Sequence, residues 1–573
     1  MGWARKEGID QKKIFTIGYW PFSTRGVSDL NETTEVPSEI LYLSKGDNLS
    51  HDSANANHLV EADEICTGYK LQDLVRRNGN IERLHPVRLL KHLLDSSEHT
   101  QQTRKDLFSI FHLLKKKWNL GTPTHFIVDL MTSMMKHAES QLRIQGISKK
   151  VPVEVVISVP VTWDTVACRT MQSVIEKSIQ NAGLGCCKDL FLVSEAEAAA
   201  VHIITETQCV EAGKCFTVLD IGGGTVDTAT YQLAQAKPPR LTEELAVPEG
   251  SLLGSTFLDQ AFRRLVEQRT KGEDRNIERI ANNIFFDFPG LKYNAKKRFE
   301  LNMLVITREE MLKIFEPVMD GIWQLLSRQL EHARANRKYI QLVLLIGGFS
   351  KSALLRRYLK EKLDGIAAPL ERHKHPENAV LLGSIKRALN KADGPERILN
   401  CAYGFKCTEQ FLPDDETTQG NAHRKQSAFR TMNRLLGGYE LKNTLFWVVN
   451  KNNSPERESM RDGRTQLSIK SFLALRRSPH QPKARGKDRE PHRKNAGAKC
   501  IGRVTVDVAP LFRGGQIQPT LESEGEARYE VELGLVFTIV CRALKFEARV
   551  SSADENGGRM QFIIASDFVL GTA

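Results

Sequence analysis

Residues 219–227 read Leu-Asp-Ile-Gly-Gly-Gly-Thr-Val-Asp, and an apolar run that begins at Phe216 leads into them. The pattern predicts a strand that ends in a sharp turn, because glycine has no Cβ and lets backbone N–H groups approach a ligand closely. Successive N–H groups in such a turn form a concave anion site that suits phosphate. Asp220 at the strand end can hold Mg²⁺ through water, since Mg²⁺ prefers oxygen ligands and keeps part of its hydration shell. Thr225 adds a hydroxyl and Asp227 a second carboxylate. The alternative is a glycine-rich hairpin that binds no ligand.

The composition indicates a globular chain with several domains. The chain has 573 residues, of which 41% are hydrophobic, with 25 Phe and 6 Trp. This is enough to bury sizeable cores in about two to four domains. The sequence contains no run of about 18 apolar residues, so we expect no membrane-spanning helix, and its first residues lack the apolar stretch of a secretory signal. The ten cysteines include no Cys-x-x-Cys pair, which favours reduced thiols and a cytoplasmic location.

The positive charge is concentrated in one stretch. The formal net charge is +12, and residues 476–499 hold nine Lys or Arg against Asp488 and Glu490. Such a composition cannot bury apolar area, so we expect a disordered basic loop. The loop could bind nucleic acid or an anionic surface electrostatically. It has no aromatic residues for base stacking, so a solvated loop is the favoured interpretation and nucleic acid is not an expected partner.

The hydrophobic pattern predicts alternating strands and helices before the glycine turn. A buried strand at 153–159, closed by Pro160, is followed by helical spacing over 165–182, with Gly183 as the helix stop. A short strand, an alanine-rich helix and the strand–turn–strand of the quoted motif follow at 190–193, 195–202 and 215–231. This β-α-β-α-β order predicts a sheet covered by helices, with ligands beyond the carboxyl ends of its strands.

A second glycine turn lies between a strand and a helix. We predict a long amphipathic helix, a buried strand and a shorter helix at 311–335, 340–346 and 353–363. Gly347, Gly348 and Ser352 lie between the strand and the shorter helix. Two glycines let a flat ring approach the backbone, and a helix N-terminus favours phosphate. An ordinary turn between strand and helix is the alternative.

Together these motifs resemble the actin-like ATPase domain of the seventy-kilodalton heat-shock chaperones. Three segments match its second phosphate loop, its adenosine motif and a loop that touches phosphate and adenosine: residues 220–227, 345–350 and 250–257. Residues 193–200 match the segment that carries a functional glutamate, here Glu195, with Ala196 where proline is usual. Residues 376–383 look like a further family segment, with Glu377 where Asp is usual.

Within the family, the heat-shock 70 kDa protein 12-like branch is the most similar. The resemblance runs from about residue 20 to residue 392, with weaker similarity at 403–404 and 446–447. It implies an α/β domain with two lobes, of the actin-like or ribonuclease H-like type, followed by a smaller β-rich region. The implied parts are an N-terminally incomplete first lobe, a second lobe, a return segment to the first lobe and the C-terminal region, at 1–205, 206–370, 371–395 and 396–573. In the last part, the runs at 504–508 and 528–550 suit strands.

The resemblance also implies ATP or ADP with Mg²⁺ in a cleft between the lobes. Asp220 would hold the water shell of the metal and Glu195 would orient the attacking water, so these are the implied catalytic residues. The implied nucleotide contacts are Gly222, Gly223, Gly224, Thr225, Gly254, Ser255, Lys292, Gly347, Gly348 and Ser352. The implied partners are the nucleotide, unfolded or extended peptide and co-chaperones, and no membrane.

The chain departs from the family at the first phosphate loop, an Asp-x-Gly-Thr-Thr motif that the sequence does not contain. Phosphoryl transfer depends mostly on positioning and electrostatic stabilisation, so we expect hydrolysis to be weakened or lost more than adenosine binding. Either an N-terminal piece is missing or the chain is a degenerate nucleotide binder. The missing piece is favoured, because a sheet without its first hairpin exposes an edge.

Three functional hypotheses follow. The main one is an ATP-binding, chaperone-like protein with weak or lost hydrolysis. The alternatives are a non-catalytic pseudo-ATPase scaffold and a small-molecule kinase of the same superfamily, for which we find no convincing catalytic Asp. The catalytic lysine of the family has no good match. Lys70 is the nearest candidate, but its surroundings match poorly and a solvated lysine is the better interpretation.

Overall fold

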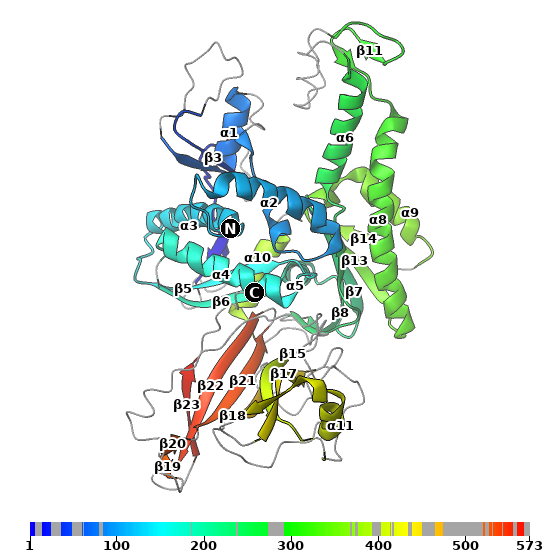
Figure 1. Ribbon diagram of the computed structural model, residues 1–573. Coiled ribbons are helices and arrows are strands. Elements are labelled where there is room, and N and C mark those ends of the chain that lie inside the picture. The colour runs from blue at the N-terminus through cyan, green and yellow to red at the C-terminus, as the bar shows by residue number, and fades with distance from the viewer. Residues whose placement is uncertain are drawn as a thin grey trace. The chain divides into compact units, whose positions relative to one another are not determined.

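The computed structural model describes residues 1–5, 14–23, 36–47, 60, 62–78, 84–184, 186–236, 239–272, 291–366, 370–372, 376, 378–391, 403–412, 414, 418–433, 438–449, 465–473, 519–521, 527–529, 531–540, 543–553 and 559–565. The chain divides into two compact units, Met1–Pro395 and Glu396–Ala573 (Figure 1). The basic segment 476–499, the strand expected at 504–508 and Glu377 lie outside the described residues. None of the helices in the described ranges combines the length and hydropathy that crossing a membrane requires.

A six-stranded sheet in the first unit carries the quoted motif. Its order is β10-β8-β7-β13-β14, and β9 also pairs with β8. The strands are β7 (Cys215–Ile221), β8 (Val226–Ala236), β9 (Pro239–Glu244), β10 (Glu249–Ser251), β13 (Ile340–Ile346) and β14 (Leu370–Arg372). β7 and β8 form an antiparallel hairpin, whereas β13 runs parallel to β7 and places Ile346 opposite Asp220. The carboxyl ends of two parallel strands therefore meet beside the glycine turn.

Both faces of this sheet are buried, which explains the continuous apolar runs of β7 and β13. Phe216 and Val218 pack in one hydrophobic cluster, and Leu219 and Ile221 pack in another. Helices α5 (Glu195–Thr207) and α10 (Ala379–Leu389) contribute to the first cluster, and α6 (Ser255–Thr270), α8 (Arg308–Ala335) and α9 (Ala353–Leu363) to the second. In Figure 1, α6 and α8 run side by side in green, in agreement with their contacts.

A separate parallel pair of strands precedes α5. β5 (Pro152–Val159) and β6 (Cys186–Ser194) are connected by α4 (Thr165–Ala182). The helix starts where the Asp164 side chain accepts a hydrogen bond from the Ala167 N–H, and it ends at Gly183, whose φ is 65°. The expected strands and helix are confirmed, but the expectation that they share a sheet with β7 is wrong. Among the described residues, β7 pairs with β8 on one edge and with β13 on the other.

The helices α5 and α10 cross at very close range. A Cβ on Gly383 would lie 1.7 Å from the carbonyl oxygen of Ala198, so only glycine allows this approach. Beside it, the Arg387 Nε donates to Glu197 Oε1 at 2.8 Å, and both side chains are almost fully buried. Because α5 follows β6 directly and packs against β7, this helix pair links the β5–β6 pair to the six-stranded sheet.

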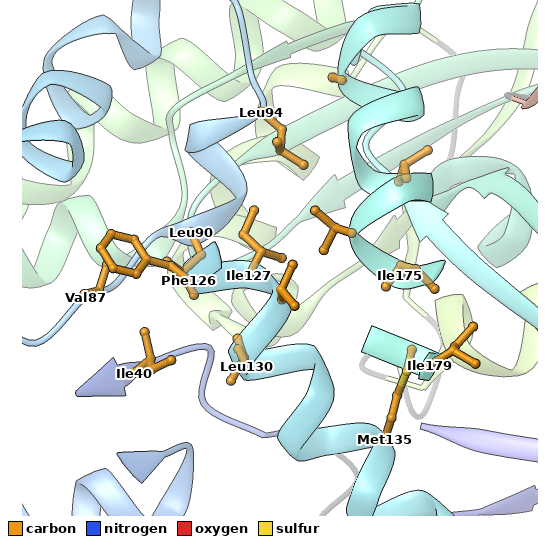
Figure 2. Packing of buried hydrophobic residues seen from close by; sticks show 14 of the residues in the cluster. Ile40, Val87, Leu90, Leu94, Phe126, Ile127, Leu130, Met135, Ile175 and Ile179 are labelled. Atoms are coloured by element: carbon orange, nitrogen blue, oxygen red, sulfur yellow. The ribbon is translucent and has the colours of Figure 1, made fainter. Parts of the chain in front are cut away.

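A further hydrophobic cluster of the first unit lies among its N-terminal helices. α3 (His125–Ile144) packs on α4 through buried residues that include Phe126, Ile127, Met135, Ile175 and Ile179 (Figure 2). The other elements on this side are β1 (Gly2–Ala4), β2 (Ile14–Thr16), β3 (Ile40–Leu43), β4 (Glu64–Thr67), α1 (Tyr69–Asn78), η3 (Leu90–Leu93), η4 (Glu98–Thr100) and α2 (Gln101–Lys115). The short turn η3 is anchored by Leu90 and Leu94 in the same core, which fixes the residues between them.

Several predicted elements of the first unit have the predicted bounds. β13 and α9 occupy 340–346 and 353–363 as expected, and α8 starts a little earlier than expected because Thr307 and Glu310 form a capping box. Beyond α6, β11 (Phe299–Glu300) and β12 (Met303–Leu304) form a small hairpin, and η5 (Gly348–Lys351) lies between β13 and α9.

The second unit consists mainly of antiparallel strands, as expected. One sheet has the order β15-β17-β16 and another the order β18-β21-β22-β23. The expected strands in 528–550 correspond to β20, β21 and β22. The elements are β15 (Tyr403–Gln410), α11 (Thr418–Lys425), η7 (Ser427–Phe429), β16 (Arg430–Asn433), β17 (Gly438–Val449), β18 (Thr465–Leu473), β19 (Pro519–Leu521), β20 (Ala527–Tyr529), β21 (Val531–Val540), β22 (Ala543–Ala553) and β23 (Arg559–Ala565). The chain is thus a mixed α/β unit followed by a β-rich unit.

Candidate functional site

The glycine turn between β7 and β8 leaves backbone donors free. The Gly222 N–H donates to the Thr225 carbonyl at 3.0 Å and closes the turn. The next three N–H groups, those of Gly223, Gly224 and Thr225, donate to no acceptor within the described part of the chain. A run of free N–H groups on a tight turn is the arrangement that binds phosphate oxygens.

Two further glycines hold the turn from either side. Gly254 precedes α6, and the first N–H groups of that helix, from Ser255 and Thr256, donate to the carbonyls of Gly222 and Gly223 at 3.2 and 2.9 Å. A Cβ on Gly254 would lie 2.2 Å from the Gly223 carbonyl oxygen. These carbonyls point towards the helix, so the free N–H groups of the turn can face a ligand.

Gly347 approaches the other end of the turn. Its φ is 79°, and a Cβ there would lie 2.5 Å from the Ile221 carbonyl oxygen and 2.6 Å from Asp220 Oδ1. The second glycine turn is therefore in contact with the strand end that carries Asp220. Gly348 follows with open space beside its Cα, as the approach of a flat ring requires, whereas Ser352 caps α9 by accepting from the Leu355 N–H at 3.4 Å.

Three carboxylates and one ammonium group surround the strand end. Asp220 and Asp227 are opposite each other across the hairpin. Lys91 Nζ donates to Glu195 Oε1 at 2.7 Å, and Thr162 Oγ1 donates to Asp227 Oδ1 at 3.2 Å. This arrangement brings the two implied catalytic residues, Glu195 and Asp220, into one charged cluster.

Burial and mutual repulsion shift the titration of this cluster. Burial, together with the charges of Glu195 and Asp227, raises the pKa of Asp220 to about 8, although Lys91 opposes the shift. Burial and Glu195 likewise raise the pKa of Asp227 to about 7. The charge of Glu195 raises the pKa of Lys91, so its ammonium group stays protonated. The cluster thus holds more carboxyl groups than its one lysine can keep ionised, and strongly shifted pKa values of this kind are common at functional sites.

Most of the predicted site residues lie close together in the structure, but not all of them do. Gly222, Gly223, Gly224, Thr225, Gly254, Ser255 and Gly347 all lie at the glycine turn or in direct contact with it, and Gly348 follows Gly347. Lys292 is exposed, and within the described ranges no hydrogen bond or ion pair links it to the cluster. Its assignment as a nucleotide contact stays a prediction.

Sequence reasoning missed Lys91 and His92. Both lie on η3, and the preceding Leu89 has a left-handed backbone with φ 57°. Lys70, the nearest candidate from the sequence, instead pairs with Glu64 and lies 5.6 Å from the ring centroid of Phe22. A Lys-His pair within an apolar stretch is the signal that could have indicated them, because a buried histidine such as His92 needs a partner.

The donor set fits a magnesium–nucleotide complex. Among the described residues, no three His, Cys, Asp or Glu side chains are grouped to bind a metal ion directly. Mg²⁺ that keeps several waters needs only one or two carboxylates and the phosphates of its substrate. Asp220 at the strand end, together with the free N–H groups of the turn, provides that combination.

Comparisons with known proteins find distant relatives of the chain. The chain is 23% identical over 349 residues to the chaperone protein HscA homolog of Acinetobacter baumannii, covering 58% of this chain and 50% of that protein. It is 26% identical over 250 residues to the human heat shock 70 kDa protein 12B, covering 36% of each. The chaperone protein HscA of Buchnera aphidicola is 22% identical over 227 residues, covering 38% of this chain and 42% of that protein.

The chain shows distant homology to the heat-shock 70 proteins. The chain spans about half the length of the bacterial chaperone relative. No family model matches the chain. The mixed α/β architecture of the first unit is consistent with this distant relationship.

Proposed function

We propose that the chain binds Mg-ATP at the glycine turn and acts as a chaperone-like protein of the heat-shock 70 type. The observation that carries the proposal is the cluster of Asp220, Asp227 and Glu195 around Lys91, next to the free N–H groups of the turn. The three carboxyl groups have one ammonium group to balance them when they ionise, and the N–H groups of the turn donate to no acceptor among the described residues. A complex of a divalent cation with a phosphate chain supplies both at once.

We also propose a specific architecture for the first unit. The α/β unit would be an actin-like ATPase domain with two lobes, in which α5 and α10 form the connection. The nucleotide would extend from Gly347 and Gly348, where the adenosine would lie, along the turn towards Gly224. The distant homology to HscA and to the human protein supports this assignment.

The side chains of the cluster suit the control of a water molecule. Lys91 holds Glu195 in place through a charge-assisted hydrogen bond, and the remaining Glu195 oxygen can accept from a water near the turn. Bound Mg²⁺ would neutralise the charge that develops on the phosphates. Catalysis of phosphoryl transfer rests on such positioning. Because the 573-residue sequence offers no Asp-x-Gly-Thr-Thr loop, we expect this chain to hydrolyse ATP slowly or not at all.

We also propose binding partners and a cellular location for the protein. The antiparallel sheets of the second unit could hold an extended peptide, as the chaperone assignment requires, and co-chaperones would respond to the nucleotide state. We propose a cytoplasmic protein on the basis of its cysteine pattern. A pseudo-ATPase scaffold would share the fold without catalysis, and in the form that binds only partners it would lack nucleotide affinity.

The test is a calorimetric titration of the 573-residue chain with Mg-ATP, compared with Asp220→Asn. We expect saturable binding by the wild type. The variant should bind at least about tenfold more weakly, because it loses a charged ligand of the hydrated metal. Asp364→Asn, an exposed residue after α9, is the matched control and should bind like the wild type. A folded wild type that binds no nucleotide would support the scaffold instead.

A further inference from the structure

His92 is a buried imidazole at the glycine turn. The side chain is 3% exposed, and its Nε2 lies 3.6 Å from the position that a Cβ would take on Gly224. The ring therefore faces the turn that carries the free N–H groups. Neither Lys91 nor His92 belongs to the sheet, and η3 brings both to it from a distant part of the chain.

The His92 ring has no hydrogen-bond partner among the described residues. Its Nδ1 is buried without one, and no described residue bonds to Nε2. A buried polar group without a partner costs free energy, so such groups in native proteins usually meet water or a ligand. Nε2 is the ring atom that faces the turn, so an acceptor-rich ligand at the turn can pair with Nε2 and with the backbone donors together.

The backbone around His92 holds the ring in this position. The His92 N–H donates to the Leu89 carbonyl at 3.0 Å, and Leu90 and Leu94 on either side pack in the core (Figure 2). These contacts fix the backbone of His92, and the ring itself is buried at the turn. The imidazole is thus preorganised, which is the condition for a precise contact with a ligand.

The His92 ring is neutral near neutral pH. Burial lowers the pKa of His92, Asp95 opposes this effect, and Lys91 and Arg104 add to it. A neutral imidazole offers one N–H donor and one acceptor. Phosphate oxygens only accept, so the N–H would have to point towards the phosphate.

His92 and Gly347 lie at opposite ends of the glycine turn, so they would contact different ends of the nucleotide. Gly347 meets the turn at Asp220 and Ile221, whereas His92 meets it at Gly224. With the adenosine at Gly347, as proposed above, the phosphate chain runs towards Gly224 and its last group arrives next to His92.

We propose that the His92 imidazole donates a hydrogen bond to the terminal phosphate of the bound nucleotide and thereby favours a triphosphate over a diphosphate. This inference rests on the proposed function, because it takes the glycine turn as the phosphate site. It assigns to this chain a residue that distinguishes the two nucleotide states by direct contact.

The test compares Mg-ATP and Mg-ADP binding by calorimetry in the full chain and in His92→Ala. Loss of a hydrogen bond to a charged group should weaken Mg-ATP binding by about ten- to a hundredfold and leave Mg-ADP binding unchanged. His92→Gln keeps an N–H donor and should recover part of the preference for ATP. His112→Ala on α2, an exposed histidine, should have no effect.

The outcomes separate the two proposals. A wild type that binds neither nucleotide overturns the proposed function and this inference with it. A wild type that binds Mg-ATP, together with His92→Ala affinities that are unchanged or equally reduced for both nucleotides, overturns the role of His92 alone. If His92→Ala does not fold, as judged by circular dichroism, the ratio of the two affinities in His92→Gln decides. His92→Asn is the reference, because its shorter amide ends at the position of Nδ1 and does not reach that of Nε2. If His92→Gln prefers Mg-ATP over Mg-ADP no more strongly than His92→Asn does, the inference is overturned.

Discussion

Asp220, Asp227 and Glu195 share one ammonium group, that of Lys91, and their burial decides how these charges behave. The ordinary pKa of an aspartate is 3.8, and both aspartates titrate well above it in the folded chain. Ionisation is therefore easier in the unfolded chain than in the folded one. Their contribution to stability is fully present below pH 3.8 and is lost as the pH rises through about 7 and about 8.

We predict that the metal-free protein becomes less stable between about pH 5 and about pH 8. Thermal unfolding in the presence of a chelator should show a lower midpoint at the higher pH. Asp220→Asn removes one of the two ionisations and should flatten this dependence. Mg-ATP should raise the midpoint of the wild type, since a ligand that binds the folded state stabilises it. An unchanged slope in Asp220→Asn would show that the cluster does not govern the pH dependence.

The site residues differ in how far sequence alone could indicate them. One short motif contains Gly222 to Thr225, so consecutive residues are enough to predict their shared role. Lys91 lies 104 residues before Glu195, and the pair forms only when the fold brings η3 to the start of α5. No local pattern encodes such a distance, so the sequence pointed to Lys70 as the nearest candidate, with surroundings that match poorly.

At the scale of helices and strands, α5 and α10 cross at very close range. Gly383 allows the backbones to meet, and the buried Glu197–Arg387 pair sits beside the crossing. Both charges have lost their water, so the pair depends on its own geometry and on further hydrogen bonds. The alanines of α5 serve the same close packing, because small side chains let the helices approach.

Gly383→Ala should therefore destabilise the protein. The new Cβ would collide with the Ala198 carbonyl, which is backbone and cannot rotate away. We expect a loss of about 1–3 kcal/mol or more, the usual cost of overpacking, measured by urea denaturation. Gly348→Ala is the control for stability, since a Cβ there meets no atom within 4 Å. Equal midpoints for the two variants would contradict the close crossing.

Elements with strong local signals were predicted well. The Asp164 cap and the Gly183 stop bound α4, and the apolar runs of β13 mark a strand buried on both faces. The assignment of strands to sheets was predicted less well. β5 and β6 were expected in the same sheet as β7, but pairing depends on which edges meet in three dimensions.

At the scale of the whole molecule, the candidate site belongs to one unit. Every described member of the cluster and of both glycine turns lies within Met1–Pro395. The second unit, Glu396–Ala573, has its own antiparallel sheets. Nucleotide binding and any peptide binding are thus carried by different units in the proposed function.

We predict that a fragment of residues 1–395 binds Mg-ATP with the affinity of the full chain. The reason is that the proposed contacts come from this unit alone. Circular dichroism should first establish that the fragment folds, and calorimetry should then compare the two affinities. A folded fragment with much weaker binding would show that the second unit contributes to the site.

The sequence by itself determined the local structure: the strand–glycine turn–strand, the capped helices and the β-rich second unit. These features depend on neighbouring residues, through backbone sterics and side-chain periodicity. Only the tertiary structure decided that β13 lies beside β7, that Gly347 touches Asp220, and that Lys91 and His92 complete the charged cluster. Burial and contact between distant segments set the pKa values of the cluster. They also leave N–H groups of the turn without acceptors among the described residues. Burial and long-range contact cannot be worked out from residue order.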